Sequence, residues 1–329
     1  MAKTKRKRKN KLPAWTGKIP TRAVVGGFVG IVLLVLSLIS LASNGDLRLV
    51  LGLPETPAPS PMPDGTLSIY YLDVGQADCE LMSIPKEDGS RYTVLIDAGD
   101  NGVEDELLQT LNDLGVEKID LAVFTHPHAD HIGGAAEVLS AIETDRVCLP
   151  PVPESMTPTT ATYESMLDIL IEREIPVTQA ESGLVLYEDK GVSLTVLSPS
   201  EQDDWDNLND WSVVLRLVYG DTAFLFMGDA EEICEEQILD SGAQLSCDVL
   251  KVGHHGSATS TSASFLQAAS PHFAVISCGK DNTYGHPDAQ TLETLQNQDV
   301  TVFRTDEDGT ILAVSDGENV TAAPLNPAA

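Results

Sequence analysis

The chain has 329 residues, of which 42% are hydrophobic and 21% charged, and its formal net charge is −30 at pH 7. Its length allows one large domain or two small ones, and its apolar content excludes an intrinsically disordered chain. The charge is uneven: residues 3–22 hold nine of the 20 Lys and Arg, and from Asp46 onward 11 basic residues face 50 acidic ones. This acidic part repels polyanions and has no basic stripe, which argues against tight nucleic-acid binding.

The N-terminal part of the chain predicts a membrane anchor. Residues 23–42 carry no charge, and a helix of this length spans a hydrocarbon core of roughly 30 Å. Seven Lys and Arg precede it within residues 3–11, and basic flanks stay in the cytoplasm. We therefore expect a single-pass protein of the cell membrane whose catalytic part is extracytoplasmic. A signal peptide cleaved near Leu41-Ala42-Ser43 is the alternative.

The remaining chain reads as one folded domain on a spacer. Residues 54–63 are rich in proline, which makes the spacer extended and semi-rigid. Five cysteines without a C-x-x-C pair argue against a disulfide framework. The expected organisation is a basic cytoplasmic tail at 1–22, a transmembrane helix at 23–42, a linker at 43–65, a folded domain at 66–320 and a tail at 321–329.

Short apolar runs alternate with helical patterns through the folded domain. This order predicts two packed sheets with helices outside them. The expected strands are 67–74, 79–83, 92–96, 121–125 (in an apolar run 119–124 that reads as one buried strand), 192–197, 212–219, 223–227, 249–252 and 273–277, and the expected helices are 104–114, 135–142, 163–173, 231–239, 262–268 and 288–296.

The segment 125–134, with the sequence THPHADHIGG, carries the strongest chemical signal. It contains three of the seven histidines and lies where an expected buried strand ends, on a rigid support. Imidazole and carboxylate are ligands that Zn²⁺, Mn²⁺ and Fe accept. The spacing lets His126 and His128 face one metal ion while Asp130 and His131 turn to a second.

Two later segments extend this metal interpretation. Asp229 ends an apolar strand, where it could bridge two ions or cap the following helix. His254 and His255 follow another strand and are flanked by glycines, which allow close backbone approach. One of the pair should complete the second metal site, and the other should face the substrate as a proton donor. Adjacent positions leave the order open; we favour His255 as the ligand and His254 as the donor.

Other polar residues have supporting roles in this interpretation. His286 lies in a Gly- and Asn-rich loop and either lines the substrate site or is simply exposed. Asp78 and Asp97 follow early strands, and we expect them to orient ligands or fix loops rather than to bind metal.

These segments together resemble the metallo-β-lactamase superfamily. More narrowly, they are similar to the hydrolase domain of the ComEC competence-protein family, over a match from about Leu67 to Arg304. The motifs that carry the similarity, in fixed order, are residues 71–78, 95–99, 126–134, 209–215, 252–257 and 284–287. The resemblance implies an α/β fold, an αββα sandwich with a dinuclear metal site at one sheet edge, and a metal-dependent nuclease or related phosphodiesterase activity.

The resemblance also implies how the site would work. Two divalent ions, Zn or Mn, would turn a bridging water into a metal-bound hydroxide near neutral pH, and Asp130 would orient it. The implied first ion has His126 and His128, the second has Asp130, His131 and His255, and Asp229 lies between them. His286, Asn209 and Ser257 are the expected substrate contacts.

Two departures from the family pattern limit this analogy. No histidine occurs between His131 and His254, where many superfamily members supply one more ligand. Asn209 or Ser212 stands where ComEC-like members place a polar substitute, so the first ion is expected to bind weakly. Competence proteins of this family also carry a multi-helix channel, whereas this chain has one candidate span, so DNA import by this chain alone is not supported.

The expected function is therefore a membrane-anchored, extracytoplasmic, metal-dependent hydrolase that cleaves phosphodiester bonds, with DNA as the first substrate. One alternative is a phosphodiesterase for small esters such as cell-wall or lipid headgroups, and another is a β-lactamase-like acyl hydrolase. The non-enzyme alternative is an anchored metal-binding module. A thin ligand shell favours an open, catalytic site over a closed structural one. The sequence identifies no protein partner.

Overall fold

The computed structural model describes residues 65–189, 191–200 and 203–326. The expected basic tail, membrane helix and nearly all of the linker lie outside these residues. Within the described ranges, no helix combines the length and the apolar character that crossing a membrane requires. The anchor at residues 23–42 therefore stays a prediction.

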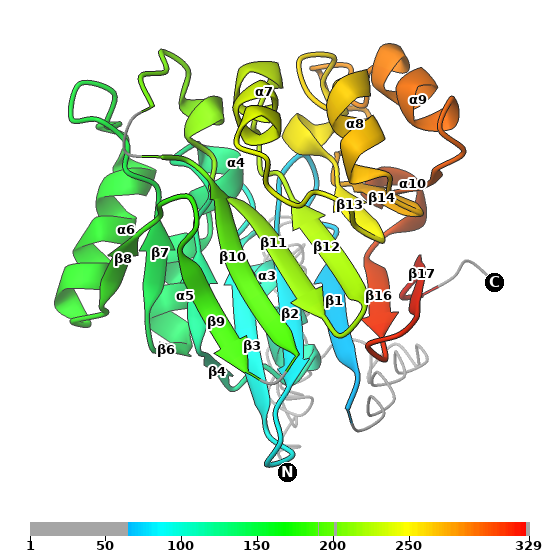
Figure 1. The fold of residues 1–329 in the computed structure, drawn as a ribbon. Coiled ribbons are helices and arrows are strands. Elements are labelled where there is room, and N and C mark those ends of the chain that lie inside the picture. Colours follow the sequence, from blue (N-terminus) through cyan, green and yellow to red (C-terminus); the bar gives the residue numbers. More distant parts are fainter. Residues whose placement is uncertain (1–64, 190, 201–202, 327–329) are drawn as a thin grey trace, which may run out of the picture. The chain divides into compact units, whose positions relative to one another are not determined.

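Two mixed β-sheets form the centre of the fold (Figure 1). The first has the strand order β17 (Val320–Pro324), β16 (Ile311–Ser315), β1 (Leu67–Tyr71), β2 (Glu80–Pro85), β3 (Arg91–Ile96), β5 (Leu121–Val123), β7 (Val147–Leu149) and β8 (Val177–Gln179). The second has the order β15 (Thr301–Arg304), β14 (Phe273–Ile276), β13 (Val249–Lys251), β12 (Thr222–Phe226), β11 (Val214–Tyr219), β10 (Val192–Ser198) and β9 (Val185–Asp189). A small separate sheet pairs β4 (Lys118–Ile119) with β6 (Glu143–Thr144).

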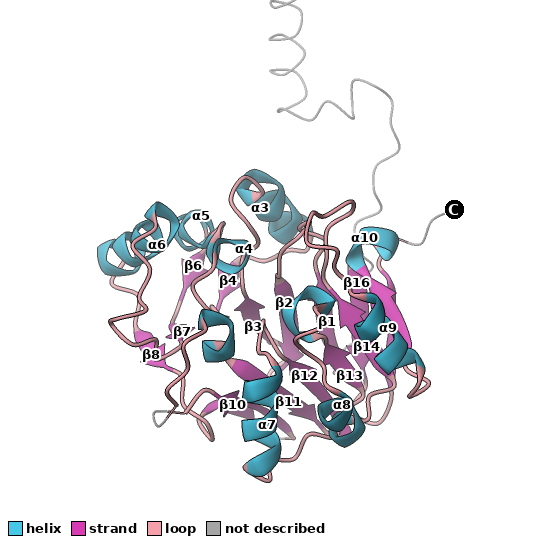
Figure 2. Ribbon diagram, turned by 90° about the horizontal axis from the view of Figure 1, so that it is seen from above, coloured by secondary structure: helices cyan, strands magenta, loops and turns pink. Residues whose placement is uncertain are grey.

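Helices cover the outer faces of both sheets (Figure 2). The first sheet is covered by α3 (Glu104–Asp113), α4 (Ala129–Ile132), α5 (Ala135–Ala141) and α6 (Ala161–Glu172). The second is covered by α7 (Glu232–Asp240), α8 (Ala263–Ala269) and α9 (Ala289–Gln296), and α10 (Thr305–Asp308) follows β15. Single 3₁₀ turns lie at η1 (Leu208–Trp211) and η2 (Gly253–Gly256). This is the αββα sandwich that the resemblance implied.

Three hydrophobic clusters hold the four layers together. One fills the space between the two sheets, where the rings of Tyr71 and Phe226 stack with centroids 6.1 Å apart. The other two lie between each sheet and its helices. Along β10 buried residues alternate with half-buried ones, as the two-residue period of a strand requires. Each large apolar side chain buried in this way contributes about 1.5–3 kcal/mol.

Most of the expected elements are confirmed, with differences at the short ones. The apolar run 119–124, expected as one strand, is divided into β4 and β5 because β4 pairs with β6 instead of joining the first sheet. The sequence did not predict β7, β8, β9 (Val185–Asp189), β15, β16 or β17. β7 and β8 have only three residues each, and strands of that length carry no readable periodicity. β17 continues past residue 320, where a tail was expected, and pairs along its whole length with β16.

The parallel strands bring the polar motifs to one edge of the sandwich. β3 and β5 are parallel neighbours in the first sheet, and β12, β13 and β14 are parallel in the second. Because parallel strands end on the same side of a sheet, the segments that follow them meet there. The backbone joins them: Ala98 donates to the carbonyl of His131, and Gly133 donates to that of Gly99.

Gly133 is where α4 approaches the loop after β3 most closely, and we predict that Gly133→Ala destabilises the fold. A Cβ there would lie 2.1 Å from the backbone carbon of Asp100, so one chain must move. We expect a loss of at least about 3 kcal/mol of unfolding free energy in urea denaturation. Gly115→Ala is the control, because its Cβ would meet nothing and only its φ of +77° opposes the change, at about 1–2 kcal/mol. Equal losses in the two variants would contradict the prediction.

Candidate metal centre

The segment 125–134 begins at the end of β5 and is fixed by Asp97 from the end of β3. The backbone N–H of Thr125 donates to one Asp97 oxygen at 2.7 Å, and its hydroxyl donates to the other at 2.7 Å. His126 and His128 follow in the turn, while Asp130 and His131 lie on the short helix α4. The expected loop-fixing role of Asp97 thus matches its contacts.

Asp229 follows β12 and is almost completely buried, at 2% exposure. Gly228 before it has a φ of +53°, and a Cβ there would lie 3.0 Å from Thr125 and 3.1 Å from Ser212. Glycine therefore lets this turn approach the histidine motif closely. The backbone N–H of Asp229 donates to the Ser212 hydroxyl at 3.0 Å. The same hydroxyl lies 3.3 Å from Nδ1 of His126.

His254 and His255 lie in the 3₁₀ turn η2 after β13. Both have left-handed backbones, with φ of +47° and +53°, a conformation that costs a non-glycine residue roughly 1–2 kcal/mol. A hydrogen bond of 3.0 Å from the His254 N–H to the Gly228 carbonyl holds this turn against the turn that carries Asp229.

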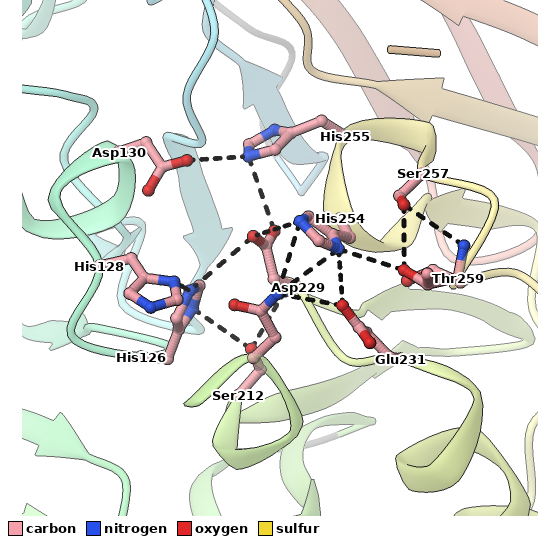
Figure 3. Close-up of polar contacts among 12 residues, drawn as sticks. His126, His128, Asp130, Ser212, Asp229, Glu231, His254, His255, Ser257 and Thr259 are labelled. Atoms are coloured by element: carbon pink, nitrogen blue, oxygen red, sulfur yellow. Dashed lines mark hydrogen bonds and ion pairs between the residues drawn. The ribbon is translucent and has the colours of Figure 1, made fainter. Parts of the chain in front are cut away.

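Four imidazoles surround the Asp229 carboxylate, two at each oxygen. Figure 3 shows His126, His254 and His255 beside this carboxylate. The Nε2 atoms of His131 and His255 lie 3.2 Å and 3.7 Å from Oδ1 of Asp229. The Nε2 atoms of His126 and His254 lie 3.8 Å and 3.7 Å from Oδ2 of Asp229. The segments after β5 and β13 therefore converge on a carboxylate that follows a third strand, β12.

His128 and Asp130 complete two groups around this carboxylate. Nδ1 of His128 lies 3.0 Å from Nε2 of His126, and Oδ2 of Asp130 lies 3.4 Å from Nε2 of His255. Ligand atoms of Asp130, His131, Asp229 and His255 all lie within 4.8 Å of one another. The structure thus brings together all six residues for which the sequence predicted metal ligation.

Unpartnered buried atoms test whether these residues fit a metal ion. Nε2 of His131, Oδ1 of Asp229 and Nε2 of His255 are buried and lie near one another, but none of them makes a hydrogen bond. Such atoms are costly unless something pairs with them. Imidazole nitrogen and carboxylate oxygen are ligands that divalent ions accept, and these three atoms lie within 4.8 Å of one another. The donor set therefore fits a divalent cation.

The far nitrogens of the same imidazoles are anchored. Nδ1 of His131 lies 2.6 Å from Asp97, and Nδ1 of His255 lies 3.0 Å from the Ser277 carbonyl. Nδ1 of His254 lies 3.1 Å from Oε1 of Glu231. Metal-binding histidines usually donate their second N–H to a carboxylate or carbonyl in this way. Sequence reasoning missed Glu231, because an acidic residue at a helix start carries no distinctive signal.

A buried ion pair supports the site from below. Nζ of Lys251 lies 2.6 Å from Oδ2 of Asp78, and both side chains are 1% exposed. The other Asp78 oxygen lies 3.3 Å from Nδ1 of His255. Burial alone would lower the pKa of Lys251, but the carboxylates of Asp78 and Glu80 raise it, so the lysine stays charged. A lysine within the apolar run 249–252 indicates a buried charge that needs a partner, but it does not indicate which residue the partner is.

The residues expected to contact substrate border the paired histidines. The ring of His286 lies 5.4 Å from that of His254 and 6.3 Å from that of His255. Nδ2 of Asn209 lies 3.5 Å from the His254 ring and donates to Glu231 at 3.1 Å. The Ser257 side chain reaches the His254 ring only through Thr259, whose hydroxyl lies 3.0 Å from that of Ser257 and 3.4 Å from Nδ1 of His254.

In the metal-free protein, protons compensate the central carboxylate. Burial alone would raise the pKa of Asp229, but His131 and His255 hold it well below its usual value. Burial alone would lower the pKa of His255, but Asp229 and Asp78 raise it to about 10. His131 likewise has a raised pKa, because Asp229 and Asp97 outweigh burial, whereas burial lowers the pKa of His126 well below its usual value. At pH 7 the imidazoles of His131 and His255 are therefore protonated, and that of His126 is neutral.

We predict that metal binding at pH 7 releases about two protons, from His131 and His255, because metal ligands must be neutral imidazoles. The raised pKa values mean that affinity falls as the pH falls, since protons then compete more strongly for the same nitrogens. Calorimetric titration with Zn²⁺ in buffers of different ionisation enthalpy measures the release. His255→Asn should release about one proton fewer. A binding enthalpy that does not depend on the buffer would contradict the prediction.

Comparison with known proteins agrees with this geometry. The metallo-beta-lactamase superfamily matches residues 87–280. ComE operon protein 3 of Bacillus subtilis is 32% identical over 261 residues, covering 74% of this chain and 32% of the relative. Competence protein ComA of Neisseria gonorrhoeae is 29% identical over 255 residues, covering 77% of this chain and 33% of the relative. This chain thus spans about a third of the length of these curated relatives.

Among solved structures, Igni18, a metallo hydrolase from the archaeon Ignicoccus hospitalis, is 18% identical with a TM-score of 0.47, covering 75% of this chain and 98% of its own.

The family match covers more than half of the chain and includes the histidine motif, Asp229 and both paired histidines. The chain belongs to the metallo-beta-lactamase superfamily of hydrolases.

Proposed function

We propose that this hydrolase cleaves phosphodiester bonds, with DNA as its first substrate. The observation that carries the proposal is the Asp229 carboxylate with two imidazoles at each oxygen, an arrangement suited to two neighbouring divalent ions. The named functions of the relatives support the choice of substrate, because these relatives are a competence protein and a ComE operon protein. A third relative is called recombination protein 2.

The residues would hold the ions in two groups. His126 and His128 face the first position, and Asp130, His131 and His255 face the second, with Asp229 between the two. Divalent ions bound there would lower the pKa of a water molecule and stabilise the charge that develops on the phosphoryl oxygens. We propose Zn²⁺ or Mn²⁺, since both accept imidazole and carboxylate together.

Asp130 is the residue best placed to orient the attacking water. Its side chain is 30% exposed, unlike the other acidic side chain of the centre. Burial alone would raise the pKa of Asp130, but the contact with His255 and the charge of His131 lower it, so the carboxylate is charged at neutral pH. It can accept a hydrogen bond from water. In the hydrolysis the water oxygen bonds to phosphorus, the ester P–O bond breaks, and one proton of the water moves to the leaving oxygen.

The surroundings of the centre limit how the substrate binds. A cavity of about 550 Å³ lies next to His286 and is lined by residues that include Lys280, Arg304, Asp306 and Glu307. Arg304 is already paired, at 2.6 Å with Asp306 and 2.9 Å with Glu307. Lys280 is the other cation of this lining, so a phosphate backbone meets little positive charge there. We infer that affinity for DNA is modest, falls with salt, and depends on the bound ions.

The same acidic surroundings favour a second candidate, a phosphodiesterase for small esters. A small monoanion meets much less repulsion than a polymer does. We also propose that residues 23–42 anchor the chain in the cell membrane with the hydrolase domain outside the cell, as the basic segment before them favours. Substrates of either class would then be extracellular or belong to the cell envelope.

Plasmid nicking tests the proposal. The full chain is stripped of metal, reloaded with Mn²⁺ or Zn²⁺, and incubated with supercoiled plasmid or with bis(p-nitrophenyl) phosphate. We expect metal-dependent nicking that salt weakens, with Asp130→Ala reducing the rate at least about 100-fold because the water loses its orienting carboxylate. His131→Ala should lose activity together with metal.

His272→Asn is the matched control, because the side chain of this histidine is 78% exposed and its ion-pair partner is Asp248, which is not part of the metal centre. It should retain full activity. If the folded, metal-loaded chain hydrolyses the small diester but leaves plasmid intact, the second candidate replaces the first. If it hydrolyses neither, the phosphodiesterase proposal is wrong.

A further inference from the structure

The first group of ligands is short of one histidine by comparison with the second. Sequence analysis left it with His126, His128 and the shared Asp229, and gave His254 to the substrate as a proton donor. We propose instead that His254 is the missing ligand of the first ion, so that the two adjacent histidines bind different ions. This inference deepens the proposed function and rests on its metal dependence.

The distances place His254 with the first group. Its Nε2 lies 3.7 Å from Oδ2 of Asp229, and Nε2 of His126 lies 3.8 Å from the same oxygen. Nδ1 of His128 lies 3.0 Å from Nε2 of His126. Ligand atoms about 2.0–2.2 Å from a tetrahedral ion lie roughly 3.4 Å from one another, and the two separations from Asp229 are close to this value. His126, Asp229 and His254 do not form a set within 4.8 Å among the described residues, so the two rings would have to move toward each other to hold one ion. His255 contacts the other oxygen, Oδ1.

The partners of His254 are those of a metal ligand. Its Nδ1 lies 3.1 Å from Oε1 of Glu231, and Asn209 donates to that same oxygen at 3.1 Å. This repeats the relation of His131 to Asp97 in the second group. With Nδ1 held by a carboxylate, the lone pair of Nε2 is directed at the Asp229 side. Asn209 then acts through Glu231 and does not replace the missing ligand itself.

The backbone explains how neighbours in sequence reach two ions. Two consecutive left-handed residues are rare outside glycine, and here they turn the rings apart, with centroids 6.1 Å apart and planes at 62°. Hydrogen bonds from the His254 N–H to Gly228 and from the Ser257 N–H to the His254 carbonyl fix this conformation. If only one histidine of this turn bound metal, only its ring would need a hydrogen-bonding partner. Both rings have one, Glu231 for His254 and Ser277 for His255.

The first group is the more open of the two. Among the described residues, its ligand atoms do not form a set that lies entirely within 4.8 Å, whereas those of the second group do. We therefore expect the two ions to bind in order, the second position filling first and the first position needing a higher metal concentration.

Metal counting in the full chain tests the assignment of His254. The wild type, His254→Asn and His272→Asn are stripped and titrated with Mn²⁺, and bound metal is measured by elemental analysis and electron paramagnetic resonance. Asparagine tolerates a left-handed backbone, so His254→Asn removes the ligand with little strain. We expect two ions with a spin-coupled spectrum in the wild type and His272→Asn, and one uncoupled ion in His254→Asn.

Glu231→Gln provides a second variant in case His254→Asn does not fold. It should weaken binding of the first ion about 10–100-fold and leave the other unchanged, as loss of a partner of a ligand does. Two ions bound to His254→Asn with wild-type affinity, or one ion bound to the wild type, would overturn the assignment. Slow hydrolysis by a His254→Asn variant that holds both ions would identify His254 as a proton donor. Two ions in the wild type and one in His254→Asn, in a protein that cleaves no phosphodiester, would support the assignment while refuting the proposed function.

Discussion

The arrangement of the site depends on one buried carboxylate, that of Asp229. Both of its oxygens face imidazole nitrogens from the loops after β5 and β13, and its own loop follows β12. Burying such a charge without compensation would cost several kcal/mol, so the surrounding positive charge is a condition for the fold as well as for chemistry. The ends of β5 in the first sheet and of β12 and β13 in the second meet around this single group.

The same condition links stability to the bound ion. In the metal-free chain, protons on His131 and His255 compensate Asp229, and the charged Lys251 compensates Asp78 just below. At the second position, divalent ions would replace those protons with little movement of the ligands, because these already lie within 4.8 Å of one another and the far nitrogens of His131 and His255 are held by Asp97 and Ser277. A ligand that binds only the folded state also stabilises it. The second position is thus more fully organised than the first.

The sequence predicted the layers, and the residues that meet around Asp229, better than it predicted the contacts that support them. The histidine motif and Asp229 could be found because metal ligands cluster at strand ends in a recognisable spacing. Glu231 and the pairing of Lys251 with Asp78 join residues up to 173 positions apart, and no local pattern encodes such contacts. Which oxygen of Asp229 His254 and His255 each face could not be derived either, because this depends on two left-handed backbone conformations that only the folded turn defines. Short strands such as β7 were not predicted, because three residues are too few to show a period of two.

The central claim, a pair of divalent ions held on the two oxygens of Asp229, is tested most directly by anomalous X-ray diffraction from crystals of the Mn²⁺-loaded protein. The geometry predicts two anomalous peaks, one beside Oδ1 near His131 and His255 and one beside Oδ2 near His126 and His254. A single peak, or peaks that leave Asp229 without a bound ion, would contradict it.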